Sequence, residues 1–187
     1  EYGRLELIKM VFDAAHETNP DAQLLINDFN LSDEYAKIIA ECLEVGTPIH
    51  AIGIQTHQHQ GYKGMAWLEE VLQRFEVFGL PMHFTENTLI SGDIMPAYTE
   101  DLNDWQVDEW PSTPEGEEAR KNKLEEMTRI LFADKNVQAM TMWDFTDGMW
   151  LKAPSGMLKA DNTIKPVYKM LQGLVKDEWS TKGTATS

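Results

Sequence analysis

Short apolar runs alternate with amphipathic segments of helical period along this chain, and that alternation limits the folds open to it. Helical spacing of apolar residues predicts helices over residues 4–18, 32–46, 67–78, 114–131 and 166–174. Four apolar runs between them are typical of buried strands, at residues 23–26, 49–54, 82–86 and 137–142. Strands that alternate with helices form parallel sheets with right-handed crossovers. The sequence therefore predicts one helix followed by four strand–helix units.

Polar or aromatic side chains follow each predicted strand. The four groups are Asn27, Asp28, Phe29 and Asn30; Gln55, His57 and His59; Glu86 and Asn87; and Trp143, Asp144, Asp147 and Trp150. A (β/α)8 barrel builds its site in this way, at the carboxyl ends of its strands, whereas a doubly wound sheet concentrates its site at one switch point. No glycine-rich phosphate fingerprint follows any strand. The pattern favours half of a (β/α)8 barrel over a small doubly wound sheet.

Composition excludes several classes of protein. The 187 residues are 42% hydrophobic, enough for one domain with a sizeable core. A formal net charge of −15 argues against nucleic acid and anionic membranes as partners. No run approaches the roughly 20 apolar residues of a membrane helix. The single cysteine, Cys42, excludes an internal disulfide and a cysteine-based zinc site.

Glu86 is the first candidate for a catalytic residue. The apolar run that begins at Met82 ends abruptly at this carboxylate, and a long segment without period follows, up to Pro114. Loops of that length are uncommon unless they are functional or disordered, and Trp105 and Trp110 argue against disorder.

The residue types after the strands suit a neutral, polyhydroxylated ligand. Amides hydrogen-bond hydroxyl groups, and indole faces stack on the C–H faces of sugars, so carbohydrate is the leading substrate class. A metal site built from His57, His59 and Glu86 is the competing interpretation, although His-x-His on an irregular segment is a weak signal. For Asp28 and Asp147, capping or hydrogen bonding of loops is the simpler interpretation.

Five motifs in fixed order carry a family resemblance across nearly the whole chain. They are Asn19-Pro20-Asp21-Ala22 through Asn27-Asp28-Phe29-Asn30, Gly53-Ile54-Gln55-Thr56-His57, Phe84-Thr85-Glu86, Trp143 through Trp150, and Lys165-Pro166-Val167-Tyr168. Together they resemble the C-terminal half of a glycoside hydrolase family 10 endo-β-1,4-xylanase. The resemblance implies a (β/α)8 TIM barrel to which residues 1–179 supply strands five to eight, with a polar tail over 180–187. It also implies a secreted or periplasmic enzyme of xylan degradation that needs no cofactor and no metal.

The same resemblance assigns roles to individual residues. Glu86 matches the catalytic nucleophile, and His57 matches the histidine that orients it. Six residues match positions that bind substrate: Asn27, Asp28, Phe29, Gln55, Trp143 and Trp150. A retaining glycosidase also needs a second carboxyl group as general acid and base. In the family this is a glutamate in an Asn-Glu pair at the end of strand four, and the 187 residues contain no Asn-Glu pair.

That departure predicts a partner. We expect this chain alone to be inactive or nearly so, and to associate tightly with a complementary N-terminal half that carries the acid/base glutamate. Such a half would be a separate chain, a proteolytic product or a part of the gene outside this sequence; self-association is the weaker alternative. A non-catalytic carbohydrate-binding half-barrel and a metal-dependent TIM-barrel enzyme remain the other function hypotheses.

Four residues differ from the family pattern. Asn87-Thr88 stands where Leu-Asp usually follows the nucleophile, which removes an aspartate that buttresses the histidine. Phe29 stands where the family commonly has a tyrosine. Asp144 stands where the family usually has a glycine, and the sequence assigns this extra acid no role.

Overall fold

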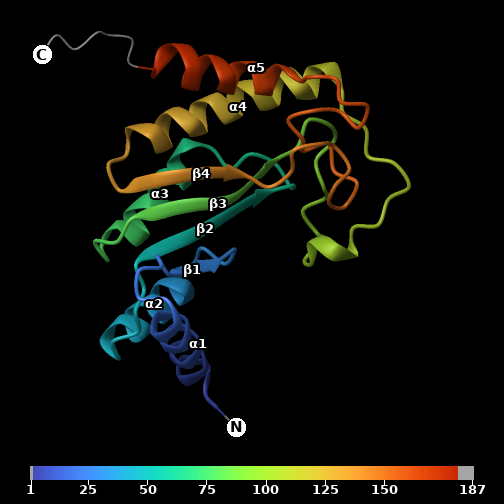
Figure 1. The fold of residues 1–187 in the computed structure, drawn as a ribbon. Coiled ribbons are helices and arrows are strands. Elements are labelled where there is room, and N and C mark those ends of the chain that lie inside the picture. Colours follow the sequence, from blue (N-terminus) through green and yellow to red (C-terminus); the bar gives the residue numbers. More distant parts are fainter. Residues whose placement is uncertain (1, 181–187) are drawn as a thin grey trace, which may run out of the picture. The chain divides into compact units, whose positions relative to one another are not determined.

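The computed structural model describes residues 2–180 and contains one parallel sheet (Figure 1). Its elements are α1 (Arg4–Thr18), β1 (Leu25–Asp28), α2 (Asp33–Glu44), β2 (Ala51–Gln58), α3 (Met65–Glu76), β3 (Met82–Leu89), α4 (Pro114–Ala133), β4 (Val137–Met142) and α5 (Pro166–Gly173). A short 3-10 helix, η1 (Leu102–Asp104), lies between β3 and α4, and a π-helical turn, η2 (Leu174–Glu178), follows α5. Of the expected polar tail, residues 181–187 lie outside the described residues.

Contacts divide the chain into two compact units. The first comprises residues 1–57, 63–87 and 130–143, and the second comprises 58–62, 88–129 and 144–187. The single domain expected over residues 1–179 stays a prediction.

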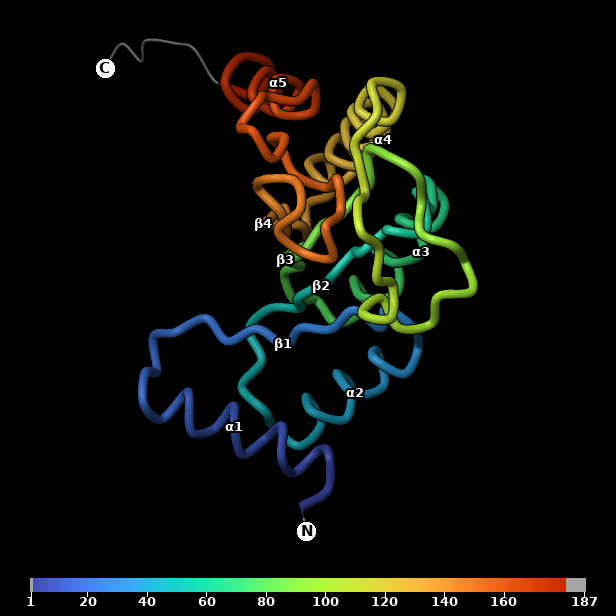
Figure 2. The backbone as a smooth tube through the Cα atoms, turned by 90° about the vertical axis from the view of Figure 1, so that its right-hand side faces the viewer, coloured from blue at the N-terminus to red at the C-terminus, as the bar shows by residue number. Residues whose placement is uncertain are grey.

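The first unit is built on the sheet, whose strands follow the order β1-β2-β3-β4. β1 pairs in parallel with β2, with Ile26 opposite Ile52, and β3 pairs in parallel with β4. The backbone view in Figure 2 shows α1 and α2 side by side along β1. This arrangement confirms the predicted strand–helix order and the parallel sheet.

Local signals in the sequence fix the helix ends. Ser32 caps α2 through its side chain, which accepts a hydrogen bond from the Glu34 amide at 3.2 Å. Thr113 caps α4 in the same way, accepting from the Gly116 amide at 3.0 Å. Gly46 stops α2 with a φ of 74°, a left-handed conformation that glycine adopts without strain. These predicted boundaries are confirmed.

The predicted ends of three strands were wrong. β1, β2 and β3 each continue past the apolar run into the polar residues, to Asp28, Gln58 and Leu89 respectively. The reason is that polar side chains within the sheet find hydrogen-bond partners on neighbouring strands. Thr56 and Asn87 are each 1% exposed, and their side chains hydrogen-bond each other. Glu86 therefore lies within β3 and not at its end.

The second unit has a core of its own under the long segment after β3. Met95, Trp110 and Ala153 are buried together, and Trp105 packs against them. These contacts agree with the expectation that Trp105 and Trp110 argue against disorder of this segment.

Buried cations hold the second unit together away from its apolar core. Arg120 on α4 is 0% exposed and donates to the backbone carbonyls of Ser155 and Gly156. Lys165, also 0% exposed, donates to Asp147 at 2.5 Å and to Ser91 at 2.8 Å. The Lys165 ammonium and the two terminal nitrogens of Arg120 thus have hydrogen-bond partners, whereas the buried Arg120 Nε has none.

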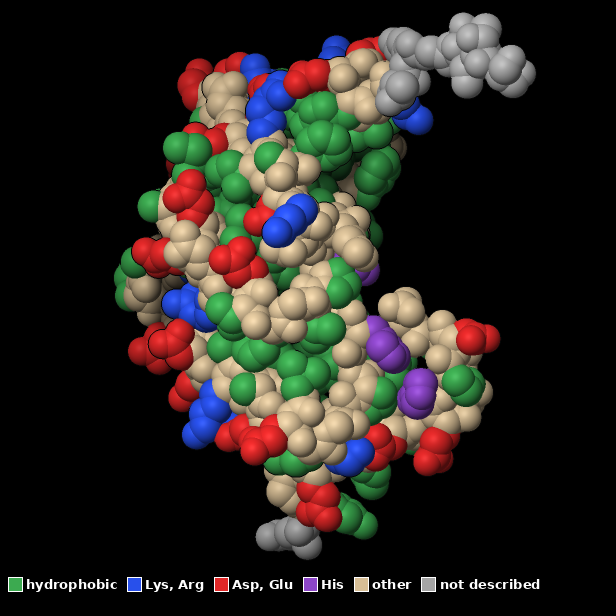
Figure 3. Space-filling model, turned by 90° about the vertical axis from the view of Figure 1, so that its left-hand side faces the viewer, with side chains coloured by type: hydrophobic (Ala, Val, Ile, Leu, Met, Phe, Trp, Pro, Cys, Tyr) green, Lys and Arg blue, Asp and Glu red, His purple; other side chains and the backbone are tan. Residues whose placement is uncertain are grey.

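The surface reflects the acidic composition. Figure 3 shows acidic side chains spread over the visible face, with lysine and arginine side chains between them. No helix among residues 2–180 combines the length and hydropathy needed to span a membrane.

Candidate active site

A β-bulge in β3 decides where Glu86 points. Phe84 pairs with Met140 of β4 and Asn87 pairs with Met142, so three steps along β3 face two along β4. A single extra residue reverses the alternation of side chains beyond it. Phe84 and Asn87 both lie on the buried face, at 0% and 1% exposure. Strict alternation would place the Glu86 side chain on the same face of the sheet as Phe84. The extra residue places it on the opposite face instead.

The Glu86 carboxylate contacts His57 of the neighbouring strand, β2. His57 Nε2 lies 3.2 Å from Glu86 Oε2, and the two side chains are 10% and 17% exposed. The two atoms are within hydrogen-bond distance, and the tautomer of the His57 ring sets which of them donates. The structure thus brings together the two predicted catalytic residues, in contact and open to solvent on one side.

Trp143 completes a three-residue group. Its indole meets the His57 ring edge to face, with ring centroids 5.9 Å apart and planes at 84°. Its amide donates to the Asn87 carbonyl at 3.1 Å, directly after the end of β4. The side chain is 47% exposed. An exposed indole in contact with His57 is a surface on which a sugar ring can stack.

Asn27 and Gln55 lie near the same strand ends, on β1 and β2. Asn27 Oδ1 accepts a hydrogen bond from Thr85 at 2.7 Å, across the intervening strand. The Asn27 side chain passes over Gly53, where an added Cβ would lie 2.9 Å from Asn27 Cβ. Gln55 is two residues before His57 and therefore on the same face of β2, partly exposed.

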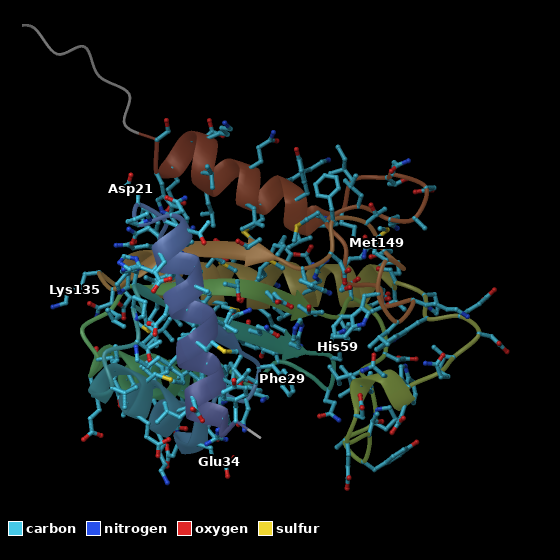
Figure 4. The ribbon with its side chains drawn as sticks, turned by 60° about the horizontal axis from the view of Figure 1, so that its bottom comes forward. Asp21, Phe29, Glu34, His59, Lys135 and Met149 are labelled. Atoms are coloured by element: carbon cyan, nitrogen blue, oxygen red, sulfur yellow. The ribbon has the colours of Figure 1, made fainter. Side chains whose placement is uncertain are left out.

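The residues that follow β1 differ in character. Asp28 accepts from the Asn30 amide at 2.8 Å, which confirms the prediction that it hydrogen-bonds a loop. Phe29 is 73% exposed. Figure 4 shows Phe29 at one end of the sheet and Lys135, which precedes β4, at the other. Phe29 is therefore available to a ligand at the carboxyl end of β1.

Trp150 and His59 belong to the second unit. The Trp150 ring meets the His59 ring edge to face at 5.0 Å, and His59 is 1% exposed. Trp110 lies 6.2 Å from the same histidine ring. His59 is thus buried among indoles. Within residues 2–180, no three histidine, cysteine, aspartate or glutamate side chains form a group that could hold a metal ion.

The two aspartates after β4 have structural partners. Asp147 accepts from Lys165 and, at 2.8 Å, from the Gly156 amide, which confirms that it hydrogen-bonds a loop. Asp144 is 4% exposed and accepts from the Ser155 hydroxyl. The unassigned acid at this position therefore fixes the segment that contains Trp150.

A family model decides what this arrangement belongs to. The model described as glycosyl hydrolase family 10 matches residues 1–173. The chain belongs to glycosyl hydrolase family 10. A TIM-barrel fold comes with that membership.

Curated relatives within family 10 are xylanases. The chain is similar to a β-1,4-xylanase of Dictyoglomus thermophilum, with 37% identity over 86 residues that cover 43% of the chain and 24% of the relative. It is similar to endo-1,4-β-xylanase A of Caldicellulosiruptor saccharolyticus, with 30% identity over 149 residues that cover 76% of the chain and 41% of the relative. The chain therefore spans less than half the length of these relatives.

Solved family 10 structures share the fold. The xylanase XynB of Paenibacillus barcinonensis superposes with a TM-score of 0.73 at 23% identity, covering 90% of this chain and 53% of that one. Xylanase 10B of Thermotoga maritima gives a TM-score of 0.70 at 21% identity, covering 92% and 52%. The four parallel strand–helix units are thus part of a (β/α)8 barrel, as the sequence predicts.

The contacts of three residues near this pair were not predicted from the sequence, although Asn87 is among the polar residues expected after a strand. Thr56, Thr85 and Asn87 make the side-chain hydrogen bonds that tie β1 to β3 and β2 to β3. The available signal is the polar run through the strand ends: the predicted strand over residues 82–86 contains Thr85, whereas Thr56 and Asn87 lie just beyond the predicted ends. Only knowledge of the register would have turned it into a prediction of contacts.

Proposed function

We propose that this chain carries the nucleophile half of a retaining endo-β-1,4-xylanase. The observation that supports the proposal is the contact between Glu86 and His57 within a family 10 fold. In the proposed reaction, Glu86 attacks the anomeric carbon of a xylosyl unit to form a covalent glycosyl-enzyme. A second carboxyl group protonates the leaving oxygen, and it then activates the water that releases the sugar. His57 holds the carboxylate in the attacking orientation.

Xylan and xylo-oligosaccharides are the proposed substrates. Xylose units are neutral and polyhydroxylated, which suits the amides of Asn27 and Gln55 and the exposed rings of Phe29 and Trp143. Asp28 and Trp150 are proposed to bind further units. The names of the relatives, all β-1,4-xylanases, support this choice over other glycans.

The acid/base carboxyl group is proposed to come from a complementary part of the barrel, namely strands one to four. Two features of the first unit support this partner. β1 and β4 each have a single neighbour in the sheet, so one edge of each strand is available for pairing. No residue of α1 is buried, and Leu7, Met10 and Val11 are 48%, 47% and 58% exposed. Closure of a barrel would cover both edges and this helix.

The proposal further places residues 1–179 as strands five to eight of that barrel and predicts little or no turnover by this chain alone. Co-expression with the first half of a family 10 barrel tests both points. We expect a stable one-to-one complex by size exclusion with light scattering, and xylanase activity in the complex only. A folded monomer that gains no partner and no activity would contradict it. Release of the enzyme outside the cytoplasm, in secreted or periplasmic form, is proposed from the family resemblance.

The catalytic assignment is tested by Glu86→Gln in the assembled barrel. Loss of a nucleophile lowers kcat by about 10⁴-fold or more, so turnover of an aryl β-xyloside should disappear while xylo-oligosaccharide binding persists. Glu86→Ala with added azide provides a stereochemical check. Azide should attack from the face that the carboxylate occupied and give a glycosyl azide of inverted configuration. Unchanged turnover in Glu86→Gln would reject the assignment, and sugar binding without turnover in any assembly would favour a binding half-barrel.

A further inference from the structure

We infer that Asn87, together with Thr56, is a positioning device that holds the β3 bulge and thereby keeps Glu86 directed at His57. The inference rests on the proposed role of Glu86 and adds residues that this role alone does not assign. Asn87 follows Glu86 in the chain, and Thr56 precedes His57. A contact between Asn87 and Thr56 therefore fixes the two strands next to the catalytic pair.

Hydrogen bonds of one buried amide connect three strands. Asn87 Nδ2 donates to the Phe84 carbonyl at 3.0 Å, across the bulge within β3, and to the Thr141 carbonyl of β4 at 2.8 Å. Its Oδ1 accepts from the Thr56 hydroxyl of β2. The main-chain carbonyl of Asn87 accepts from the Trp143 amide at 3.1 Å. The network therefore reaches all three residues of the group. Glu86 and His57 are next in sequence to Asn87 and Thr56, and Trp143 is hydrogen-bonded to Asn87.

The chemistry of the network requires an amide. Two of its partners are backbone carbonyls, which only accept, and the third is a hydroxyl that donates to Oδ1. Asparagine supplies two donors and one acceptor in the required places. Leucine, the usual residue after the nucleophile in the resemblance, would leave the carbonyls of Phe84 and Thr141 and the hydroxyl of Thr56 buried without these bonds. Such unsatisfied groups are costly, so the bulge would relax.

Relaxation of the bulge would change the direction of the Glu86 side chain. Trp143 would keep its bond to the carbonyl of residue 87, because that carbonyl belongs to the main chain and is present in leucine as well. A misplacement of about 1 Å at a reacting group can cost on the order of 10²-fold in rate. The expected signature is therefore a lower kcat with little change in KM.

Three variants test the positioning role in the folded protein that contains these residues. Asn87→Leu should lower kcat on an aryl β-xyloside by about 10²-fold, with KM within about twofold. Thr56→Val removes one hydroxyl at constant shape and should lower kcat about tenfold, the equivalent of one hydrogen bond. Thr56→Ser, which keeps the hydroxyl, should restore most of the lost rate. If Asn87→Leu does not fold, the Thr56 pair of variants still decides the outcome.

Thr128→Val is the matched control. Thr128 is 7% exposed and donates to the Leu124 carbonyl within α4, so its valine variant also removes a buried hydroxyl, but one without contact to the network. We expect lower stability and unchanged kcat. An equal fall of kcat in Thr128→Val and Thr56→Val would overturn the inference, because general destabilisation would then explain both.

A spectroscopic readout separates this inference from the proposed function. The ring nitrogen resonances of His57, recorded at fixed pH, report its contact with the Glu86 carboxylate. Thr56→Val and Asn87→Leu should move them toward the values found in Glu86→Gln. If they do not move while the proteins stay folded, the positioning role is rejected and the nucleophile assignment stands. If Glu86→Gln retains full turnover but the resonances move as expected, the proposed function fails and the network is still shown to align the pair.

Discussion

His57 Nε2 lies 3.2 Å from Glu86 Oε2, although the two residues are 29 positions apart and come from neighbouring parallel strands. The contact depends on one extra residue in β3, since regular alternation would place Glu86 on the face that Phe84 buries. The geometry of this pair is therefore a property of strand register as much as of residue type.

Trp143 should contribute to sugar binding through stacking. Trp143→Ala in the assembled barrel is expected to raise the Kd for xylo-oligosaccharides roughly three- to tenfold, because an aromatic contact adds about 0.5–1.5 kcal/mol beyond its buried area. Titration calorimetry measures the change. Phe132→Ala is the control: Phe132 is 61% exposed but lies at the end of α4, before β4 begins. An equal loss of affinity in both variants would show that Trp143 has no special role.

Gly53→Ala should destabilise the sheet. The new Cβ would lie 2.9 Å from Asn27 Cβ and would also collide with Asn27 Oδ1 and a methyl group of Leu25. Relief requires moving Asn27 off Thr85, so we expect a loss of about 1–3 kcal/mol in the free energy of unfolding, measured by urea denaturation. Gly173→Ala is the control, because nothing lies within 4 Å of its Cβ position and its conformation is helical. That variant should be neutral or stabilising.

Arg120 should be among the most sensitive positions for stability. Burial, partly offset by the charges of Asp147, Asp144 and Glu117, lowers the pKa of this guanidinium to about 10, and it stays protonated at neutral pH. Arg120→Met would leave the buried carbonyls of Ser155 and Gly156 without their donor and would remove the charge that interacts with Asp144, Asp147 and Glu117, so we expect a loss of about 3–5 kcal/mol in the free energy of unfolding. Arg129→Met, on the same helix, removes a cation whose ion pairs with Glu125 and Glu178 are at the surface. Chemical denaturation should show a large change for the first variant and little for the second.

Glu117 should make stability depend on pH in the acidic range. Burial alone would raise the pKa of its carboxyl group, but hydrogen bonds from Lys159 and Ser112, with the charges of Lys159 and Lys165, hold the pKa below its ordinary value of 4.5. The folded state therefore favours the ionised form. This stabilisation is complete above the unfolded pKa and is lost as pH falls through the lower, folded pKa.

The difference in unfolding free energy between the parent protein and Glu117→Gln should accordingly shrink as pH falls from 6 toward 3. Lys159→Met removes the ammonium that lies 2.8 Å from the Glu117 carboxylate. In the Lys159→Met background, the difference in unfolding free energy caused by Glu117→Gln should therefore be smaller. A difference that does not change with pH would mean that the Glu117 charge contributes nothing to folding.

Much of the fold could be predicted from local patterns. The helix that begins at Pro114 behind its Thr113 cap, and the strand over residues 137–142, agree with α4 and β4 because capping chemistry and apolar periodicity are encoded in adjacent residues. The ends of β1, β2 and β3 could not be predicted in this way. Their polar residues stay in the strands because partners from other strands satisfy them, as Thr56 and Asn87 do for each other.

The sequence by itself determined the order of strands and helices, the helix caps and the residue types at the strand ends, including the pair Glu86 and His57. Tertiary structure alone decided that Glu86 faces His57, that Asn87 is a buried hub, and that Arg120 and Lys165 are buried cations. The physical reason is that these features depend on how one strand or loop is aligned with another. A bulge is one extra residue relative to a partner strand, and the sequence of a single strand contains no record of that count.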